Sequence, residues 1–143
     1  MPDFEFPILF FDGCCPFCNF VVRMIYRLDR RGILRFAPIE SGIGQAAIER
    51  HPEMKAVDSA FILDYDERGA EHISAKSDML ARLAGYIEWP GKILLLPFKL
   101  LPRKWGDCLY DLVARNRSRW FGRYESCSIP PTGLRERFLP NRL

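Results

Sequence analysis

The sequence lacks any apolar run that approaches the roughly 20 residues needed to cross a bilayer. Its first residues, Met-Pro-Asp-Phe-Glu, lack the basic start of a secretory signal. No internal repeat or low-complexity segment is visible, and 48% hydrophobic with 27% charged residues is typical of a folded globular chain. We therefore expect one domain over residues 1–143, in the cytoplasm and without a membrane span.

Residues that commonly bind metals are scarce. His51 and His72 are the only histidines, Cys108 and Cys127 are isolated, and the single C-x-x-C has no second copy. A structural zinc site would need these scattered residues to converge, so we expect no metal and no cofactor. Five cysteines, an odd number in a chain without an export signal, also argue against a structural disulfide framework. Cys127 is interpreted as an incidental thiol.

Charge is mild overall but uneven along the chain. The net charge is +3, whereas residues 92–123 carry eight Lys or Arg against two Asp, a local charge of +6. This is either the solvated face of helices packed on a core, or a docking surface for an acidic partner or a membrane surface. No recognition motif accompanies the charge, so we expect no nucleic-acid partner.

The most informative segment is residues 12–18, Asp-Gly-Cys-Cys-Pro-Phe-Cys. Residues 7–11 are a continuous apolar run of buried-strand type, which Asp12 and Gly13 break. After the cysteines, apolar side chains recur at helical spacing: Phe17, Phe20, Val21, Met24, Ile25 and Leu28. A C-x-x-C between a strand and a helix is typical of a redox-active dithiol, here Cys15 and Cys18.

The spacing assigns a role to each cysteine of this pair. Pro16 is suited to the first helical position, which makes Cys15 the N-cap residue. The free N–H groups of Phe17 and Cys18 then point toward the Cys15 sulfur, and the helix dipole also favours its thiolate. Cys15 lies opposite the apolar stripe, so we expect it to be exposed and to attack the substrate. Cys18 lies on the flank of the stripe, so we expect it to be shielded and to resolve the mixed disulfide.

Three neighbouring residues, Asp12, Gly13 and Cys14, complete the segment. Asp12 is either a proton acceptor for the dithiol or, with Gly13, simply a turn former. A disulfide between sequence neighbours is strained, so Cys14 is a poor partner for Cys15. We interpret Cys14 as a bystander on the loop.

The rest of the pattern completes a fold. The further elements expected are a strand at 33–38, a helix capped by Ser41, a strand at 59–65, its hairpin partner at 70–75, and a helix capped by Ser77 and Asp78. The order βαβαββα, with the first two strands parallel, predicts an α/β protein with a thioredoxin-like core over residues 6–88. Residues 89–143 are expected to form a mostly helical extension. One of its helices carries an apolar face of Trp105, Cys108, Leu109, Leu112 and Val113.

The chain resembles the DCC family of thiol–disulfide oxidoreductase-like proteins, named for an Asp-Gly-x-Cys-x-x-Cys signature. Asp12, Gly13, Cys15 and Cys18 match that signature. The likeness continues through residues 29–32, 36–41, 76–78, 105–110, 114–117, 121–123 and Cys127. The resemblance implies the thioredoxin-like fold and thiol–disulfide exchange. Thioredoxins place a cis-proline just before the third strand, and Ser59 is the candidate for that position here.

Two functions follow. The first is an enzyme that exchanges the Cys15–Cys18 dithiol or disulfide with protein or small thiol substrates. The second is a binding module whose C-x-x-C senses redox state or is inert, with the basic C-terminal half as its working surface.

Overall fold

The computed structural model describes residues 6–56, 60–88 and 91–122. Its elements in chain order are β1 (Ile8–Phe11), α1 (Pro16–Leu28), β2 (Arg35–Pro38), α2 (Gly42–Arg50), the 3-10 helix η1 (Pro52–Ala56), β3 (Ala60–Tyr65), β4 (Glu71–Ala75), α3 (Lys76–Leu83), α4 (Gly91–Leu100) and α5 (Arg103–Phe121). The order through α3 is the predicted βαβαββα, and the thioredoxin-like α/β core is confirmed.

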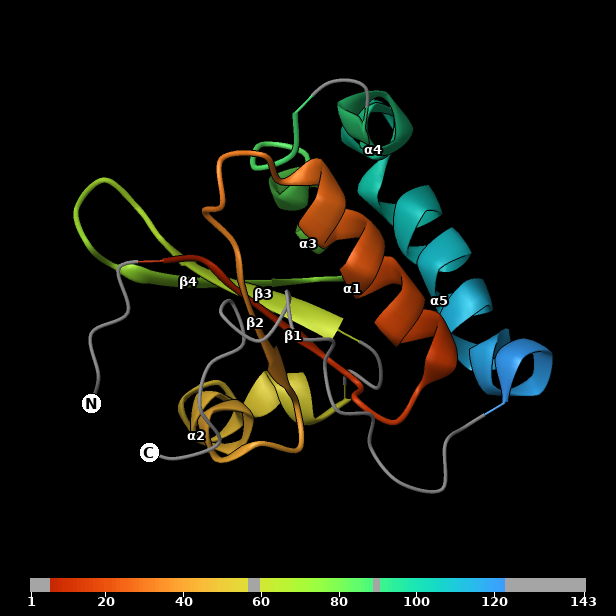
Figure 1. The fold of residues 1–143 in the computed structure, drawn as a ribbon, viewed down its shortest axis with the longest axis horizontal. Coiled ribbons are helices and arrows are strands. Elements are labelled where there is room, and N and C mark those ends of the chain that lie inside the picture. The colour runs from red at the N-terminus through yellow and green to blue at the C-terminus, as the bar shows by residue number, and fades with distance from the viewer. Residues whose placement is uncertain (1–5, 57–59, 89–90, 123–143) are drawn as a thin grey trace.

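The four strands form one mixed sheet in the order β2-β1-β3-β4. β1 pairs parallel with β2 and antiparallel with β3, and β4 pairs antiparallel with β3. In Figure 1, α1 and α3 lie on one side of the sheet and α2 on the other. All four residues of β1 are buried, because this central strand is covered on both faces.

Alternate residues of β1 therefore belong to two cores. Leu9 and Phe11 pack with α1 and α3 in one cluster, whereas Ile8 and Phe10 pack with α2 in the other. Phe10 stacks on Phe61 of β3, with ring centroids 4.9 Å apart. The strand thus holds both helix layers in place, and its C-terminal end leads directly into the cysteine segment.

One predicted helix start is confirmed and another is wrong. Ser41 caps α2, since its hydroxyl accepts the Gly44 N–H at 3.2 Å. In contrast, α3 begins at Lys76 directly after β4, and its N-cap, Ala75, makes no side-chain bond. Ser77 lies inside the first turn, where its N–H and hydroxyl both donate to Asp107 of α5. Ser77, which was expected to cap α3, instead binds Asp107 and so joins α3 to the C-terminal extension.

The extension is helical over its described part. Helices α4 and α5 pack on α3, and α5 also contacts α1, beside which it runs in Figure 1. Residues 123–143 lie outside the described residues. Among residues 6–56, 60–88 and 91–122, no helix is long and apolar enough to cross a membrane.

The face that α5 turns to the core shares Val113 with the apolar face expected and differs from it at the larger side chains. Trp105 has 67% of its surface exposed, and Leu109 and Leu112 are also exposed. The inner face instead carries Gly106, Tyr110, Val113, Ala114 and Arg117, which are buried or half-buried. This arrangement leaves large apolar side chains at the surface and buries an arginine.

Candidate active site

The N-terminus of α1 forms the centre of the site, as predicted. Cys15 is the N-cap in extended conformation, Pro16 opens the helix, and the Cys18 N–H donates to Cys15 Sγ at 3.4 Å. The Asn19 side-chain amide donates to the carbonyls of Gly13 at 3.0 Å and of Cys15 at 2.9 Å. These bonds fix the loop against the helix, so the position of Cys15 is determined by local geometry.

The expected exposure of Cys15 is wrong. Cys15 has 0% of its surface exposed and Cys18 has 8%, and both are free thiols. Both sulfurs belong to the apolar cluster between the sheet and the helices α1 and α3. The expectation considered only the position of Cys15 relative to the apolar stripe of its own helix. In the structure, other parts of the fold cover this N-cap residue.

Arg117 of α5 joins the site and was not predicted as a functional residue. Its Nη1 donates to Cys18 Sγ at 2.9 Å, and its Nη2 lies 3.2 Å from Asp12 Oδ2. The guanidinium therefore bridges a sulfur on α1 and a carboxylate at the end of β1, 99 residues from Cys18 in sequence. Both partners of the ion pair are buried, and such a pair is retained where it is well hydrogen-bonded.

The environment of Cys18 opposes its ionisation. Burial raises the pKa of the Cys18 thiol, the Arg117 guanidinium opposes this rise and Cys15 adds to it, with a net value of about 12. Cys18 is consequently protonated at neutral pH. Its role as the resolving cysteine stays a prediction.

Asp12 acts in the turn as well as in the ion pair. Its Oδ1 accepts the Cys14 N–H at 3.0 Å, which is the turn-forming bond expected of an Asp at this position. The Gly13 N–H donates to Glu40 Oε2 at 3.3 Å, and a Cβ at Gly13 would lie 3.3 Å from the Pro38 side chain. Burial, together with a hydrogen bond to Asp12, raises the pKa of Glu40. The role of Asp12 as a proton acceptor stays a prediction.

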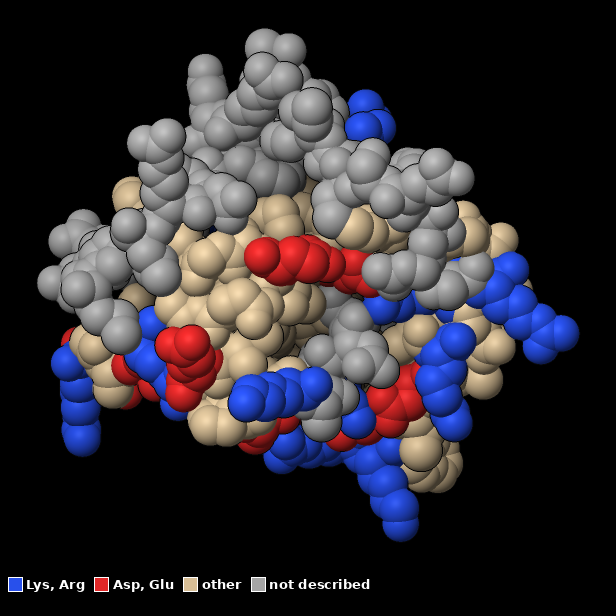
Figure 2. Space-filling model, turned by 90° about the horizontal axis from the view of Figure 1, so that it is seen from below, with Lys and Arg blue, Asp and Glu red and all other residues tan. Residues whose placement is uncertain are grey.

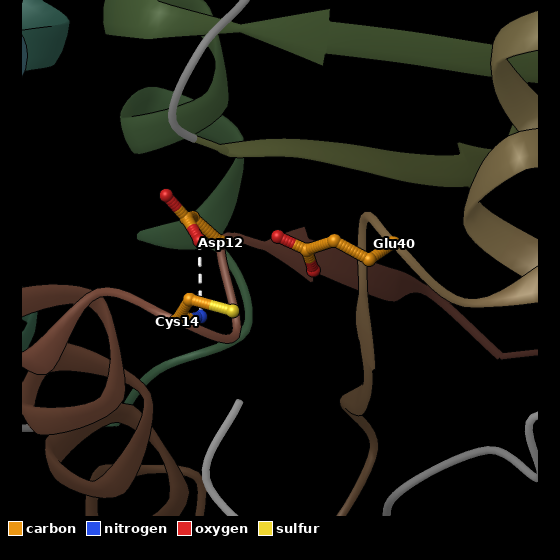
Figure 3. Close-up of side chains that lie close together, drawn as sticks. All are labelled: Asp12, Cys14 and Glu40. Atoms are coloured by element: carbon orange, nitrogen blue, oxygen red, sulfur yellow. Dashed lines mark hydrogen bonds between the residues drawn. The ribbon is translucent and has the colours of Figure 1, made fainter. Parts of the chain in front are cut away.

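Asp12, Cys14 and Glu40 form the cluster of potential metal ligands among the described residues. Figure 3 shows the Cys14 sulfur and the two carboxylates around one space, and their ligand atoms lie within 4.8 Å of one another. Cys14, however, is itself disulfide-bonded, so its sulfur is not a thiolate that could bind a metal. This bond corrects our interpretation of Cys14 as a bystander on the loop.

A cavity of about 380 Å³ lies beside the dithiol, between the sheet and helices α1, α3, α4 and α5. Its walls are almost entirely apolar, with Val21 and Met79 among them. Cys18 and Arg117 also line the cavity, so a thiol and a guanidinium interrupt its apolar wall. The Cys18 sulfur thus faces a medium of low polarity on one side and a cation on the other.

The other residues that the sequence singled out are Phe17, Ser59, Cys108 and Cys127. Phe17, inside the C-x-x-C, stacks on Phe121 near the end of α5, with centroids 5.0 Å apart. Cys108 is an exposed free thiol on the outer side of α5. Ser59 and Cys127 lie outside the described residues.

The fold and the cysteine pair define a thioredoxin-like protein with a dithiol at the start of its first helix. The model of the DCC1-like thiol-disulfide oxidoreductase family matches residues 9–123, so the chain belongs to this family, as its signature predicts. At the level of the family, this membership indicates oxidoreductase activity.

Two curated relatives support the assignment. Uncharacterized protein YuxK of Bacillus subtilis (strain 168) is 28% identical over 133 residues, which cover 93% of each chain. The chloroplastic DCC family protein At1g52590 of Arabidopsis thaliana is 31% identical over 123 residues, covering 86% of this chain and 69% of that protein. No solved structure matches the chain significantly.

Proposed function

We propose that the protein exchanges its Cys15–Cys18 dithiol or disulfide with protein or small thiol substrates. The observation that carries the proposal is the cap at α1, where the Cys18 N–H donates to Cys15 Sγ and Cys18 itself follows one turn later. A helix N-terminus with a free N–H directed at the sulfur favours thiolate on Cys15. The buried Cys18 thiol stays protonated beside it.

The reaction has two steps. Cys15 thiolate attacks a substrate disulfide and releases one substrate thiolate, which leaves a mixed disulfide on Cys15. Cys18 then attacks the Cys15 sulfur, so that the Cys15–Cys18 disulfide forms and the second substrate thiol departs. The reverse sequence oxidises a substrate dithiol. Since Cys15 has no exposed surface, exchange requires a local rearrangement that opens the site to substrate.

The test is exchange of a glutathione mixed disulfide, followed with wild-type protein and with Cys15→Ser, Cys18→Ser and Cys108→Ser. Cys108→Ser is the matched control, because it removes a free thiol that is exposed and lies outside the site. We expect loss of turnover with Cys15→Ser, a trapped adduct on Cys15 with Cys18→Ser, and wild-type turnover with Cys108→Ser. Full turnover by Cys15→Ser would contradict the proposal and favour a binding role.

A second candidate is binding to an anionic membrane surface through α4 and α5. These helices expose large apolar side chains, namely Ile93, Leu96, Leu100, Trp105, Leu109, Leu112, Trp120 and Phe121. Exposed basic side chains lie on α5 as well, among them Arg103, Lys104, Arg115 and Arg119. In Figure 2, Lys and Arg lie mainly along the lower and right edges of the face seen from below, with Asp and Glu between them. Apolar area combined with cations suits a surface of anionic lipid.

Vesicle co-sedimentation tests this candidate. We expect binding to phosphatidylglycerol vesicles that weakens with salt, and little binding to phosphatidylcholine. The double variant Trp105→Ser with Leu112→Ser should lose it. Phe20→Ser, which removes an equally exposed aromatic side chain from α1, should retain it. Equal binding of both variants, or none by the wild type, would exclude the role.

A further inference from the structure

Arg117 lies where the second step of thiol exchange takes place. Its Nη1 is 2.9 Å from Cys18 Sγ, the atom that must attack, and its Nη2 is 3.2 Å from Asp12 Oδ2. The arginine is 5% exposed, and such burial is unusual for this residue type unless the charge is paired. The pairing with Asp12 offsets the cost of burying the charge, and the Cys18 sulfur is a second partner.

We propose that Arg117 is a third catalytic residue of the dithiol site: its guanidinium stabilises the thiolate that Cys18 forms when it attacks the mixed disulfide, and Asp12 holds the guanidinium in place. The inference rests on the proposed function, because it assigns a residue to one step of that reaction. It extends the site from the thioredoxin-like core to the C-terminal helix α5.

The step is balanced without any further reactant. Cys18 loses its proton, its sulfur forms a bond to Cys15 Sγ, and the bond between Cys15 and the substrate sulfur breaks. The electron pair of the broken bond leaves with the substrate sulfur, which takes up a proton to become a thiol. Cys15 and Cys18 are oxidised to a disulfide, and the substrate is reduced.

The contacts also explain when Cys18 becomes reactive. In the free dithiol, burial is the largest cause that opposes ionisation of Cys18; Arg117 favours it, and a charge on Cys15 and the hydrogen bond between the two sulfurs add to the opposition. Once Cys15 is bonded to substrate it carries no charge, so this opposition ends. The favourable contribution of Arg117 persists in the mixed disulfide. Cys18 is thus held as a thiol until Cys15 has reacted, and it is easier to ionise afterwards.

The apolar cavity strengthens the effect. Cys18 and Arg117 both line it, and the other walls are almost entirely apolar. A thiolate there has few alternative polar partners, and the attraction of the guanidinium is less screened than in water. A charge-assisted hydrogen bond in such surroundings is stronger than one at the surface.

The two steps can be separated with 5,5′-dithiobis(2-nitrobenzoate), used in single turnovers with the reduced full-length protein in a background of Cys14→Ser, Cys108→Ser and Cys127→Ser, which leaves Cys15 and Cys18 as its only thiols. Attack by Cys15 releases one coloured thiolate, and resolution by Cys18 releases the second. Peptide mapping assigns the intermediate to Cys15. The variants are Arg117→Met, Arg117→Lys and, as control, Arg115→Met, which removes an exposed arginine two positions away on the same helix.

For Arg117→Met we expect a second release at least about tenfold slower, as loss of a hydrogen bond to a charged group implies. The first release should slow less, because Arg117 attracts a charge on Cys15 but donates its hydrogen bond to Cys18. The pH profile of the second release should move to higher pH. Arg117→Lys should be intermediate, since one ammonium cannot reproduce the fork that reaches both Cys18 and Asp12. Arg115→Met should match the parent protein in both phases.

Other outcomes overturn the inference. Equal slowing of both phases would give Arg117 a structural role only, and an unchanged second phase would remove it from the reaction. If Arg117→Met does not fold, by circular dichroism, Arg117→Lys decides: parental rates in both phases exclude the guanidinium role. If the parent protein itself shows no Cys15-dependent first phase, the proposed function fails, and the inference fails with it.

Discussion

The buried ion pair between Asp12 and Arg117 should be worth far more to stability than a surface pair of the same length. Its atoms are 3.2 Å apart and its side chains are 7% and 6% exposed. Lys76 and Asp111 also join α5 to the core, at 3.1 Å, but their side chains are 38% and 40% exposed. The two pairs differ mainly in burial, so comparison of the two isolates the effect of burial.

The perturbation is a double-mutant cycle on each pair. Asp12→Asn keeps an oxygen that can accept the Cys14 N–H, and Arg117→Met keeps much of the side-chain volume. Each single change leaves one buried charge without its partner, which typically costs about 3–5 kcal/mol. The double variant removes both charges and should be destabilised by clearly less than the sum. We expect a coupling energy of about 2 kcal/mol or more for this pair, against less than about 1 kcal/mol for Lys76→Met with Asp111→Asn.

Urea unfolding followed by circular dichroism gives each free energy of unfolding. All variants are measured as reduced protein at pH 7, so that the redox state of the cysteines does not differ between them. If the coupling energy of the buried pair is no larger than that of the surface pair, burial does not control this contact. The same result would weaken the argument that Asp12 holds Arg117 in place.

Three further predictions concern single groups. In native reduced protein, iodoacetamide should label Cys108 before Cys15 or Cys18, as mass spectrometry can show, because Cys108 is the exposed one of these three thiols. Earlier labelling of Cys15 would contradict its burial. The free energy of unfolding should fall above pH 9, since the unfolded chain loses the Cys18 proton near pH 9 and the folded protein keeps it until about pH 12. The free energy of unfolding of Cys18→Ala should decline less steeply over the same pH range. Gly44→Ala should destabilise by about 2 kcal/mol or more in urea, because a Cβ there would lie 2.4 Å from the Ile39 carbonyl oxygen, and parental stability would refute the clash.

The core was predictable because its signals are local. The apolar run of β1, the Asp12–Gly13 break and the helical spacing after Pro16 each act over a few residues, and each predicted the element observed. The cap by Cys15 followed from the preference of proline for the first helical position. Patterns over a few residues do not show which distant segments cover a side chain. The exposure of Cys15 was therefore mispredicted.

Arg117 could not be singled out from charge alone, because it is one of eight basic residues between 92 and 123. A signal did exist in the spacing of Tyr110, Val113, Ala114 and Arg117, which follow one another at i, i+3, i+4 and i+7. A competing stripe with larger apolar side chains, such as Trp105 and Leu109, pointed to the other face. The larger apolar side chains thus favoured the wrong stripe, because the inner stripe contains an arginine and no Leu, Ile, Met or Trp.

The bonding of Cys14 could not be predicted from the sequence, for a different reason. The pairing of cysteines cannot be deduced from spacing alone, so an odd total says little about whether any one of them is bonded. The argument against a bond between Cys14 and Cys15 was sound, since Cys15 is free, but it did not address more distant partners. The cysteine beside the dithiol is therefore not available as a simple competitor for Cys15.

The extension is best understood as part of the site. The family match runs through residue 123 and so includes α5 with the dithiol. Asp107 accepts two hydrogen bonds from Ser77, and Arg117 reaches Cys18 and Asp12 some ten residues later on the same helix. The bonds between Ser77 and Asp107 hold α5 against α3. Arg117 reaches Cys18 and Asp12 only when α5 lies in this position. A helix that follows the thioredoxin-like core thus supplies a charge beside the Cys18 sulfur.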